Sequence, residues 1–266
     1  MTNPHDIRTI HARRVWDSRG RPTVEAEVAL RDGATGRAIV PAGASKGTRE
    51  ALELRDATPA FGGLDVRRAV GHVNGEIARA LAGSSAADQA ALDRRLIELD
   101  GTPAKSRLGA NATLAVSMAA AHAMAASQRV PLYRYLGGAD ATLLPMPQIQ
   151  IFGGGAHAGR RVDIQDFMIV CPGARSYTEA LEWTAEVYRH AGLLMQQRGS
   201  LAGVADEGGW WPDFDTNEQA LETLLAAIER AGYAPGAQVA IALDIAASEF
   251  GRGGRYTLGL EARELD

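Results

Sequence analysis

The first part of the chain alternates between apolar and polar positions with a period of two. From residue 24 to residue 30 every second position is apolar, with Glu25 and Glu27 between them. This alternation is typical of a strand with one buried face. The segments 7–16 and 37–40 flank this strand, and an Asp-Gly pair supplies a turn before the second of them. The pattern therefore predicts a three-stranded meander.

Beyond residue 60 the spacing of apolar positions changes to three and four, the period of an amphipathic helix. It predicts helices over 66–81 and 91–99, and the alanine-rich segment 109–128 predicts a third helix because alanine is a strong helix former. One side of this third helix carries Leu114, Met118 and His122. We therefore expect residues 1–138 to form an α+β domain, a three-stranded meander plus helices, and residues 139–147 to form a linker.

The remaining residues, 148–266, combine short apolar runs with helical stretches. The apolar runs predict buried strands, and the stretches between them predict helices. The strands are expected over 148–152, 167–170 and 239–245, and the helices over 177–197 and 217–231. Strands separated by helices in this way indicate an α/β barrel or a doubly wound sheet, so a second domain is expected over residues 148–266.

Composition narrows the classes of function. The chain is 46% hydrophobic and 23% charged, as is typical of a soluble globular protein. Its formal net charge is −4, so no nucleic-acid partner is expected, because such binding needs a basic surface. Residues 1–14 lack the apolar core of a signal peptide, and no apolar run is long enough to span a membrane, so no membrane partner is expected either.

The single cysteine, Cys171, bears on location and on chemistry. One cysteine cannot form an intrachain disulfide, which favours the cytoplasm. Its apolar neighbours predict a buried core residue rather than a catalytic thiol.

Glycines and polar residues gather at the ends of the predicted strands. In the loop 42–47, Gly43 and Gly47 flank Ser45 and would let the backbone or the hydroxyl approach a ligand closely. An ordinary surface loop is the alternative. Three glycines precede His157 directly after a predicted strand, which shifts the balance from a structural towards a functional histidine.

Carboxylates occur at three further places. Gln165 and Asp166 precede an apolar run and are either functional residues or a solvated strand end. Asp206 and Glu207 are adjacent and precede two glycines. Two carboxylates in a cleft can titrate at different pH, although a charged turn is the alternative. Asp244 lies inside an apolar run, where an ionised carboxylate is costly unless it is paired or binds a cation, so it is the strongest candidate for a magnesium ligand.

Taken together, these segments resemble motifs of the enolase family. Two examples are Val40-Pro-Ala-Gly-Ala-Ser-Lys-Gly47 and Asp206-Glu-Gly-Gly209. The others are 15–24, 50–56, 99–102, 105–106, 109–112, 154–159, 165–168 and 243–250. They occur in the order of the family and span essentially the whole chain. The resemblance implies an enolase-like α+β domain followed by part of an enolase-type α/β barrel of the TIM-like kind.

The resemblance also implies an activity, a magnesium-dependent hydro-lyase that interconverts 2-phosphoglycerate and phosphoenolpyruvate. It makes Glu207 the general acid that protonates the departing hydroxyl and places Asp166 beside it. It makes Asp244 the ligand of one Mg²⁺ and Ser45 the ligand of a second. A small phosphorylated anion would be bound by His157, Gln165, Ala44 and Lys46. A homo-oligomer is implied as well.

Some residues that the family needs have no counterpart in this sequence. In the family, two further acidic metal ligands, a lysine base and a phosphate-binding arginine lie on later barrel strands. A complete α/β barrel takes about 250 residues, whereas residues 148–266 supply roughly three strands. We therefore expect a longer chain or a partner to supply the rest, and residues 1–266 alone to lack lyase activity.

The chain also departs from the family near the expected site. Lys46 stands where the family usually has threonine, Asp166 where it usually has glutamate, and Trp210 and Trp211 lie close to Glu207. The shorter Asp166 withdraws its carboxylate by about an ångström, and a misplacement on that scale can cost about 100-fold in rate. Two alternatives therefore stay open: a relative that acts on another anionic substrate, such as a phosphonate analogue, and a non-catalytic enolase fragment that serves assembly.

Overall fold

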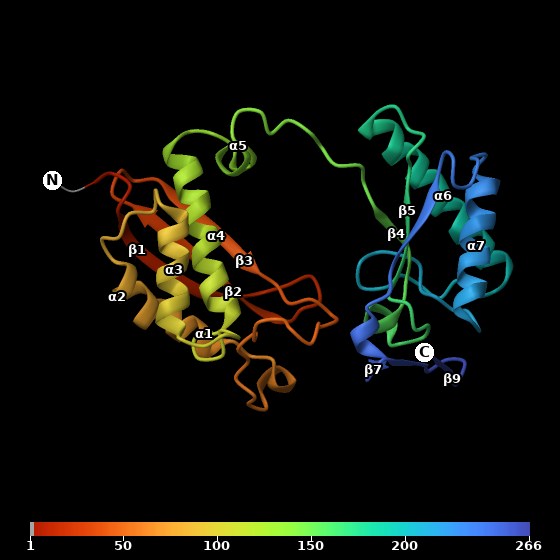
Figure 1. The fold of residues 1–266 in the computed structure, drawn as a ribbon, viewed down its shortest axis with the longest axis horizontal. Coiled ribbons are helices and arrows are strands. Elements are labelled where there is room, and N and C mark those ends of the chain that lie inside the picture. The colour runs from red at the N-terminus through yellow and green to blue at the C-terminus, as the bar shows by residue number, and fades with distance from the viewer. Residues whose placement is uncertain (1–2) are drawn as a thin grey trace. The chain divides into compact units, whose positions relative to one another are not determined.

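The computed structural model describes residues 3–266, which divide into two units (Figure 1). The first unit comprises the chain up to Gly43 together with Arg49–Thr142. The second comprises Leu143–Asp266 and includes the loop segment Ala44–Thr48. Among residues 3–266, none of the helices combines the length and the apolar character needed to cross a membrane.

A three-stranded antiparallel sheet forms one layer of the first unit. Its strands are β1 (Ile7–Trp16), β2 (Pro22–Leu30) and β3 (Thr35–Val40), in the order β1-β2-β3, so the predicted meander is confirmed. The central strand β2 is buried almost along its whole length. Glu25 is buried too, although the alternation placed it on the polar face, and its carboxylate pairs with Arg13 and Arg37.

The first predicted helix is present and contains a wider turn. It runs through α1 (Arg67–His72), the π-helical segment η2 (Val73–Ile77) and α2 (Ala78–Leu81). The predicted apolar stripe is largely confirmed, since Val66, Val73, Ile77 and Leu81 are fully buried. In the π-helical turn, the Asn74 side chain donates to the carbonyl of Ala12 (2.9 Å) and accepts from its N–H (2.7 Å). This amide therefore occupies the free edge of β1 as a neighbouring strand would.

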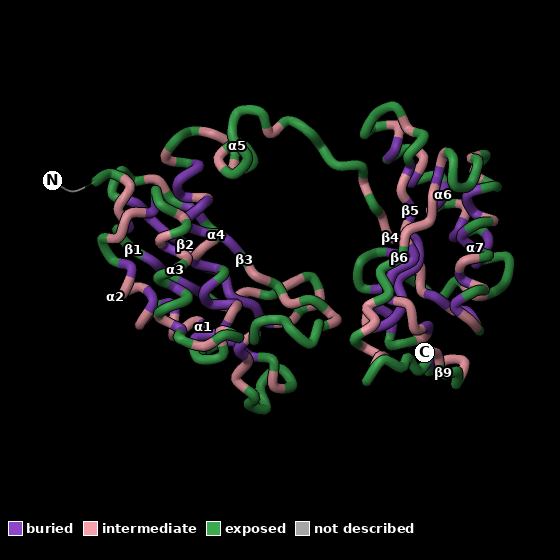
Figure 2. Tube along the Cα trace, in the orientation of Figure 1, coloured by how far each residue is buried: buried purple, intermediate pink, exposed green. Residues whose placement is uncertain are grey.

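The remaining elements of this unit are the short helix η1 (Ala60–Gly63), α3 (Gln89–Asp100), α4 (Ala110–Ser127) and α5 (Leu132–Gly137). The side of α4 that packs on the sheet consists largely of alanine, and it forms much of the buried interior in Figure 2. Leu114 and Met118 lie on the exposed side instead. Small residues let helix and sheet approach closely. A Cβ on Gly36 of β3 would lie 2.1 Å from the Ala123 nitrogen and 2.2 Å from the Ala119 oxygen.

A buried carboxylate joins β1 to the start of α1. Asp65 is 1% exposed and accepts from the Arg14 guanidinium (2.9 and 3.0 Å) and from the backbone N–H of Val66 (2.8 Å). Burial acts to raise the pKa of Asp65, but these hydrogen bonds and the charges of Arg14 and Arg67 outweigh it and hold the pKa below its usual value.

A second three-stranded sheet organises the other unit. Its strands are β4 (Ile149–Gly153), β5 (Asp166–Val170) and β6 (Ala240–Asp244), in the order β4-β5-β6, with β5 antiparallel to both neighbours. Two long helices, α6 (Tyr177–Gln197) and α7 (Asn217–Arg230), pack against each other and share a core with the sheet. The sheet formed by the described residues is not closed.

Each long helix of this unit begins at a capping side chain. The Ser176 hydroxyl accepts from the N–H of Glu179 (3.1 Å), and the Thr216 hydroxyl accepts from the N–H of Gln219 (3.0 Å). Such caps satisfy N–H groups that the first turn of a helix leaves without partners. They explain why the helices start where the sequence predicted.

The end of the chain adds small elements beside β6. They are the helix η4 (Ala247–Glu249) and a further sheet of three short strands. Its strands are β7 (Gly251–Arg252), β8 (Arg255–Leu258) and β9 (Arg263–Leu265). The short helix η3 (Gly155–Ala158) follows β4. Cys171, just after β5, is fully buried, and burial raises the pKa of its thiol, so the prediction of a core cysteine is confirmed.

The close approach of β3 to α4 makes a prediction about Gly36. We expect Gly36→Ala to lower the free energy of unfolding by about 1–3 kcal/mol, because the added methyl overlaps the backbone of α4. Gly71→Ala is the matched control, since Gly71 lies in α1 and a Cβ there has no atom within 4 Å. The control should stabilise by about 0.5–1 kcal/mol through helix propensity. Urea unfolding followed by circular dichroism measures both, and equal effects would contradict the packing described.

The depressed pKa of Asp65 makes a prediction about acid stability. Because the pKa is lower in the folded state, the stabilisation is present above the unfolded-state pKa of about 3.9 and is lost as the pH falls through the folded-state value. We expect Asp65→Asn to destabilise the protein at about pH 7 and to weaken the dependence of stability on pH below about pH 4. An acid limb identical to that of the unsubstituted protein, in urea titrations at several pH values, would contradict this.

Candidate active site

The most deeply buried carboxylate of the second unit lies at the start of β5. Asp166 is 5% exposed, and three polar side chains surround its carboxylate. Gln150 donates to Oδ1 and Gln165 donates to Oδ2 (3.3 Å), while Nδ1 of His157 lies 3.2 Å from Oδ1. Gln165 and Asp166 are therefore not a solvated strand end, and the functional alternative gains support.

His157 connects this carboxylate to Glu207. Its ring is buried, and it follows β4 in η3, with Nδ1 towards Asp166 and Nε2 towards Glu207, 3.6 Å from Oε1. The Glu207 side chain is 49% exposed, so it can meet a ligand from solvent. One ligand atom from each of His157, Asp166 and Glu207 lies within 4.8 Å of the others, a spacing compatible with a bound cation. The structure thus brings together residues from three separate segments of the chain: η3, β5 and the turn at Glu207.

A tight turn holds Glu207 in this position. Ala205 donates to the carbonyl of Gly209 (2.7 Å), and Gly208 donates to that of Ala205 (3.0 Å). The next residue, Trp210, pairs with β4 through its N–H and the carbonyl of Ile151 (2.8 Å). Its indole stacks on Tyr188 of α6, with ring centroids 4.6 Å apart. The turn is therefore fixed to the sheet by its backbone and to α6 by an aromatic pair.

Asp244 lies opposite Asp166 in the register of β5 and β6, but it is exposed. The expectation of a buried carboxylate among apolar residues is therefore wrong. Among residues 3–266 only β5 pairs with β6, so one edge of β6 is uncovered. The carboxylate still has defined partners, because Oδ2 accepts from Gln165 (3.2 Å) and Oδ1 accepts from the N–H of Ala246 (3.0 Å).

A pocket of about 130 Å³ places the loop segment Ala44–Thr48 beside Asp244. Its lining includes Ser45 and Lys46 of that segment, together with Asp244 and Glu249. The N–H of Lys46 donates to Glu249 (3.4 Å). The Asp244 carboxylate and the Ser45 hydroxyl on this pocket are oxygen donors, which is the kind of ligand that Mg²⁺ prefers. The residues present therefore fit this metal.

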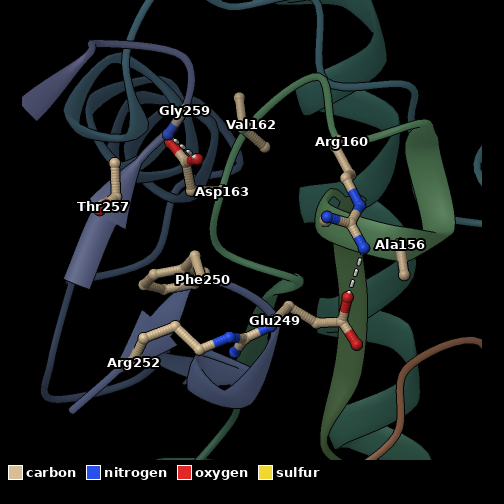
Figure 3. Close-up of a pocket in the computed structure, with 10 residues that line it drawn as sticks. Ala156, Arg160, Val162, Asp163, Glu249, Phe250, Arg252, Thr257 and Gly259 are labelled. Atoms are coloured by element: carbon tan, nitrogen blue, oxygen red, sulfur yellow. Dashed lines mark hydrogen bonds and ion pairs between the residues drawn. The ribbon is translucent and has the colours of Figure 1, made fainter. Parts of the chain in front are cut away.

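A larger cavity, of about 350 Å³, shares Glu249 with that pocket (Figure 3). Its charged groups are already engaged within the protein. Arg160 pairs with Glu249 (2.7 Å), and Asp163 accepts from the N–H of Gly259 (2.6 Å). None of the residues that the sequence predicted for the site lines this cavity. It is therefore not the candidate active site.

Gln150 was not predicted from the sequence, yet it contacts Asp166, His157 and the N–H of Gly209. Side chains alternate between the two faces of a strand, so a polar residue between Ile149 and Ile151 is expected to face solvent. The only signal was the second glutamine of the Gln148-Ile149-Gln150 segment, and this signal does not distinguish a surface residue from an active-site residue.

Two family models match the chain. The model described as Enolase, N-terminal domain matches residues 7–136, and the model described as Enolase, C-terminal TIM barrel domain matches residues 141–266. The chain belongs to the enolase family. Its domains are those of an enolase-superfamily lyase, so the enolase-type fold expected for both parts is shown. Within this enolase-family chain, the His157–Asp166–Glu207 cluster lies in the barrel part.

The two glutamine amides that donate to Asp166 make a prediction for this site. Asp166→Asn should lower the free energy of unfolding by about 1–3 kcal/mol, because an amide has only one acceptor oxygen and its NH₂ would face other donors. The matched control is Asp213→Asn, which breaks a half-exposed pair with Arg161 (2.8 Å) and should cost no more than about 1 kcal/mol. Chemical unfolding compares the two, and a larger loss in the control would contradict the described site.

Proposed function

We propose that this chain forms the acid and metal-binding part of a magnesium-dependent enolase-type lyase, which interconverts 2-phosphoglycerate and phosphoenolpyruvate. The observation that carries the proposal is one continuous polar network. It joins Glu207 through His157 to Asp166, and Asp166 through Gln165 to Asp244. An acid and a metal ligand are needed together in this reaction, and a network that joins Glu207 to Asp244 supports these two roles.

Each residue of the network has a role in the proposed reaction. Glu207 protonates the departing hydroxyl, and its half-exposed carboxyl is accessible to a substrate. Asp166 stays buried beside His157 and orients it. Gln165 is 4% exposed, and its Oε1 has no hydrogen-bond partner among the described residues, so it is available to accept from a substrate hydroxyl. An unpaired buried acceptor is costly, which supports a ligand at this position.

Asp244 would hold one Mg²⁺ and Ser45 a second, and Ala44 and Lys46 of the same loop would contact the substrate. The pocket that contains Ser45, Lys46 and Asp244 supports this assignment. When bound, Mg²⁺ supplies positive charge that stabilises the anion formed after loss of a proton next to a carboxylate. The ammonium group of Lys46 would add a positive charge to the loop and favour an anionic substrate.

A second candidate function has specific support: a related lyase reaction on another anionic substrate, such as a phosphonate analogue. The short side chain of Asp166 is already engaged by Gln150, Gln165 and His157. It is therefore held back at the strand and does not extend freely towards a substrate. Together with Lys46, this would suit a substrate shaped differently from 2-phosphoglycerate.

The magnesium assignment predicts the effect of one substitution. Asp244→Asn should weaken Mg²⁺ binding at least about 10-fold. Loss of a residue that only supports a metal ligand typically lowers metal affinity by that factor, and loss of the ligand itself should lower it at least as much. Asp215→Asn is the control, since Asp215 is exposed and lines a different pocket. Isothermal titration calorimetry measures both, and unchanged affinity in Asp244→Asn would rule out the assigned role.

Turnover distinguishes the two candidate substrates. The natural gene product is assayed with Mg²⁺ on 2-phosphoglycerate and on a phosphonate analogue, and the new enol double bond is followed by ultraviolet absorbance. Phosphoenolpyruvate formation that is lost in Glu207→Gln supports the first candidate. Faster turnover of the analogue supports the second, and turnover of neither contradicts the proposed function.

A further inference from the structure

The side-chain amide of Gln150 contacts both halves of the candidate site. Its Nε2 donates to Oδ1 of Asp166 and lies 3.4 Å from Nδ1 of His157. Its Oε1 accepts from the backbone N–H of Gly209 (2.9 Å), two residues after Glu207. One planar group therefore links the buried carboxylate of β5 to the turn that carries Glu207. A carboxylate can only accept and an N–H can only donate, so these partners fix the orientation of the amide.

Two glycines leave the space that this amide occupies. A Cβ on Gly209 would lie 2.5 Å from Oε1 of Gln150, and a Cβ on Gly153 would lie 2.9 Å from the same atom. Neither glycine has a positive φ, so backbone conformation does not require glycine at these positions. They belong to the glycine runs 153–155 and 208–209, and the proposed chemistry gives them no role. The volume of the Gln150 side chain explains the glycine at 209, and at 153 it acts together with the Cβ of Ala205, which would lie 2.6 Å from an added Cβ.

We propose that Gln150 is a positioning residue that couples the location of Glu207 to that of Asp166. This inference rests on the proposed function in giving Glu207 its role. The coupling matters because Glu207 is half exposed and is carried by a turn that closes through Gly209. A misplacement of about an ångström in a catalytic group can cost about 100-fold in rate. A neutral amide is suited to this position, because it can donate to a buried carboxylate without placing a second negative charge next to it.

Two substitutions of Gln150 separate its two contacts. Gln150→Met keeps a side chain of similar length but removes both the donor and the acceptor. Gln150→Glu keeps an acceptor for the Gly209 N–H but places a carboxylate against Asp166. Gln148→Met is the matched control, because Gln148 is exposed and lies two residues earlier.

Amide hydrogen exchange and steady-state kinetics report on the two contacts. We expect the Gly209 amide to exchange at least about 10-fold faster in Gln150→Met, because its acceptor is lost, and to stay protected in Gln150→Glu. We expect kcat on 2-phosphoglycerate to fall about 100-fold in both variants, with KM changed by no more than about 3-fold. Gln148→Met should match the unsubstituted protein in both measurements.

The outcomes separate this inference from the proposed function. Unchanged Gly209 exchange in Gln150→Met overturns the coupling, and so does a kcat in both Gln150 variants equal to that of Gln148→Met. The kinetics use the natural gene product carrying each substitution, and if its unsubstituted form turns over neither 2-phosphoglycerate nor the phosphonate analogue, the proposed function fails. The exchange rate of Gly209 in Gln150→Met still supports or overturns the coupling in that case. A loss of folding in Gln150→Met, checked by circular dichroism, leaves the test to Gln150→Glu, where a kcat equal to that of the control overturns the coupling.

Discussion

The burial of the Asp166 carboxylate is the constraint on which the rest of the site depends. An ionised group can be removed from water only if polar partners replace the water. Here Gln150, Gln165 and His157 supply those partners, one from each of three neighbouring chain segments. The polar contacts to this one carboxylate therefore fix β4, the start of β5 and the helix η3 relative to one another. The same side chains then reach outward to Asp244, Glu207 and the turn at Gly209.

The antiparallel pairing of β5 with β6 explains how Asp244, the proposed metal ligand, joins this network. It sets Asp244 directly opposite Asp166, so that Gln165 can donate to both carboxylates from a single amide nitrogen. Neutral amides between carboxylates keep like charges apart and still satisfy their acceptors. The network thus combines a buried, rigid end at Asp166 with an accessible end at Asp244 and Glu207. Rigid support for accessible groups is what positioning in an active site requires.

Most helices and strands were predicted from the sequence because their apolar positions recur with a clear period. The predictions failed for features that depend on which residues pack against an element in the fold. The strands of the first sheet and the helix α6 appeared as expected. The side of α4 that is buried was not apparent, because close packing against Gly36 selects alanine over the larger Leu114 and Met118. The exposure of Asp244 depends on which strands flank β6, and the apolar sequence of β6 does not reveal its neighbours. The role of Gln150 arises from residues distant in the sequence, so the strand pattern alone gave no sign of it.

The central claim, an enolase-type site that uses magnesium at Asp244, is tested most directly by locating a bound ion. Mn²⁺ is the suitable probe, because it prefers oxygen ligands as Mg²⁺ does and gives an anomalous X-ray signal. A crystal of the natural gene product grown with Mn²⁺ and 2-phosphoglycerate should show an anomalous peak within coordinating distance of the Asp244 carboxylate, with the ligand beside Glu207 and His157. An anomalous peak elsewhere, with Asp244 free of metal, would contradict the account.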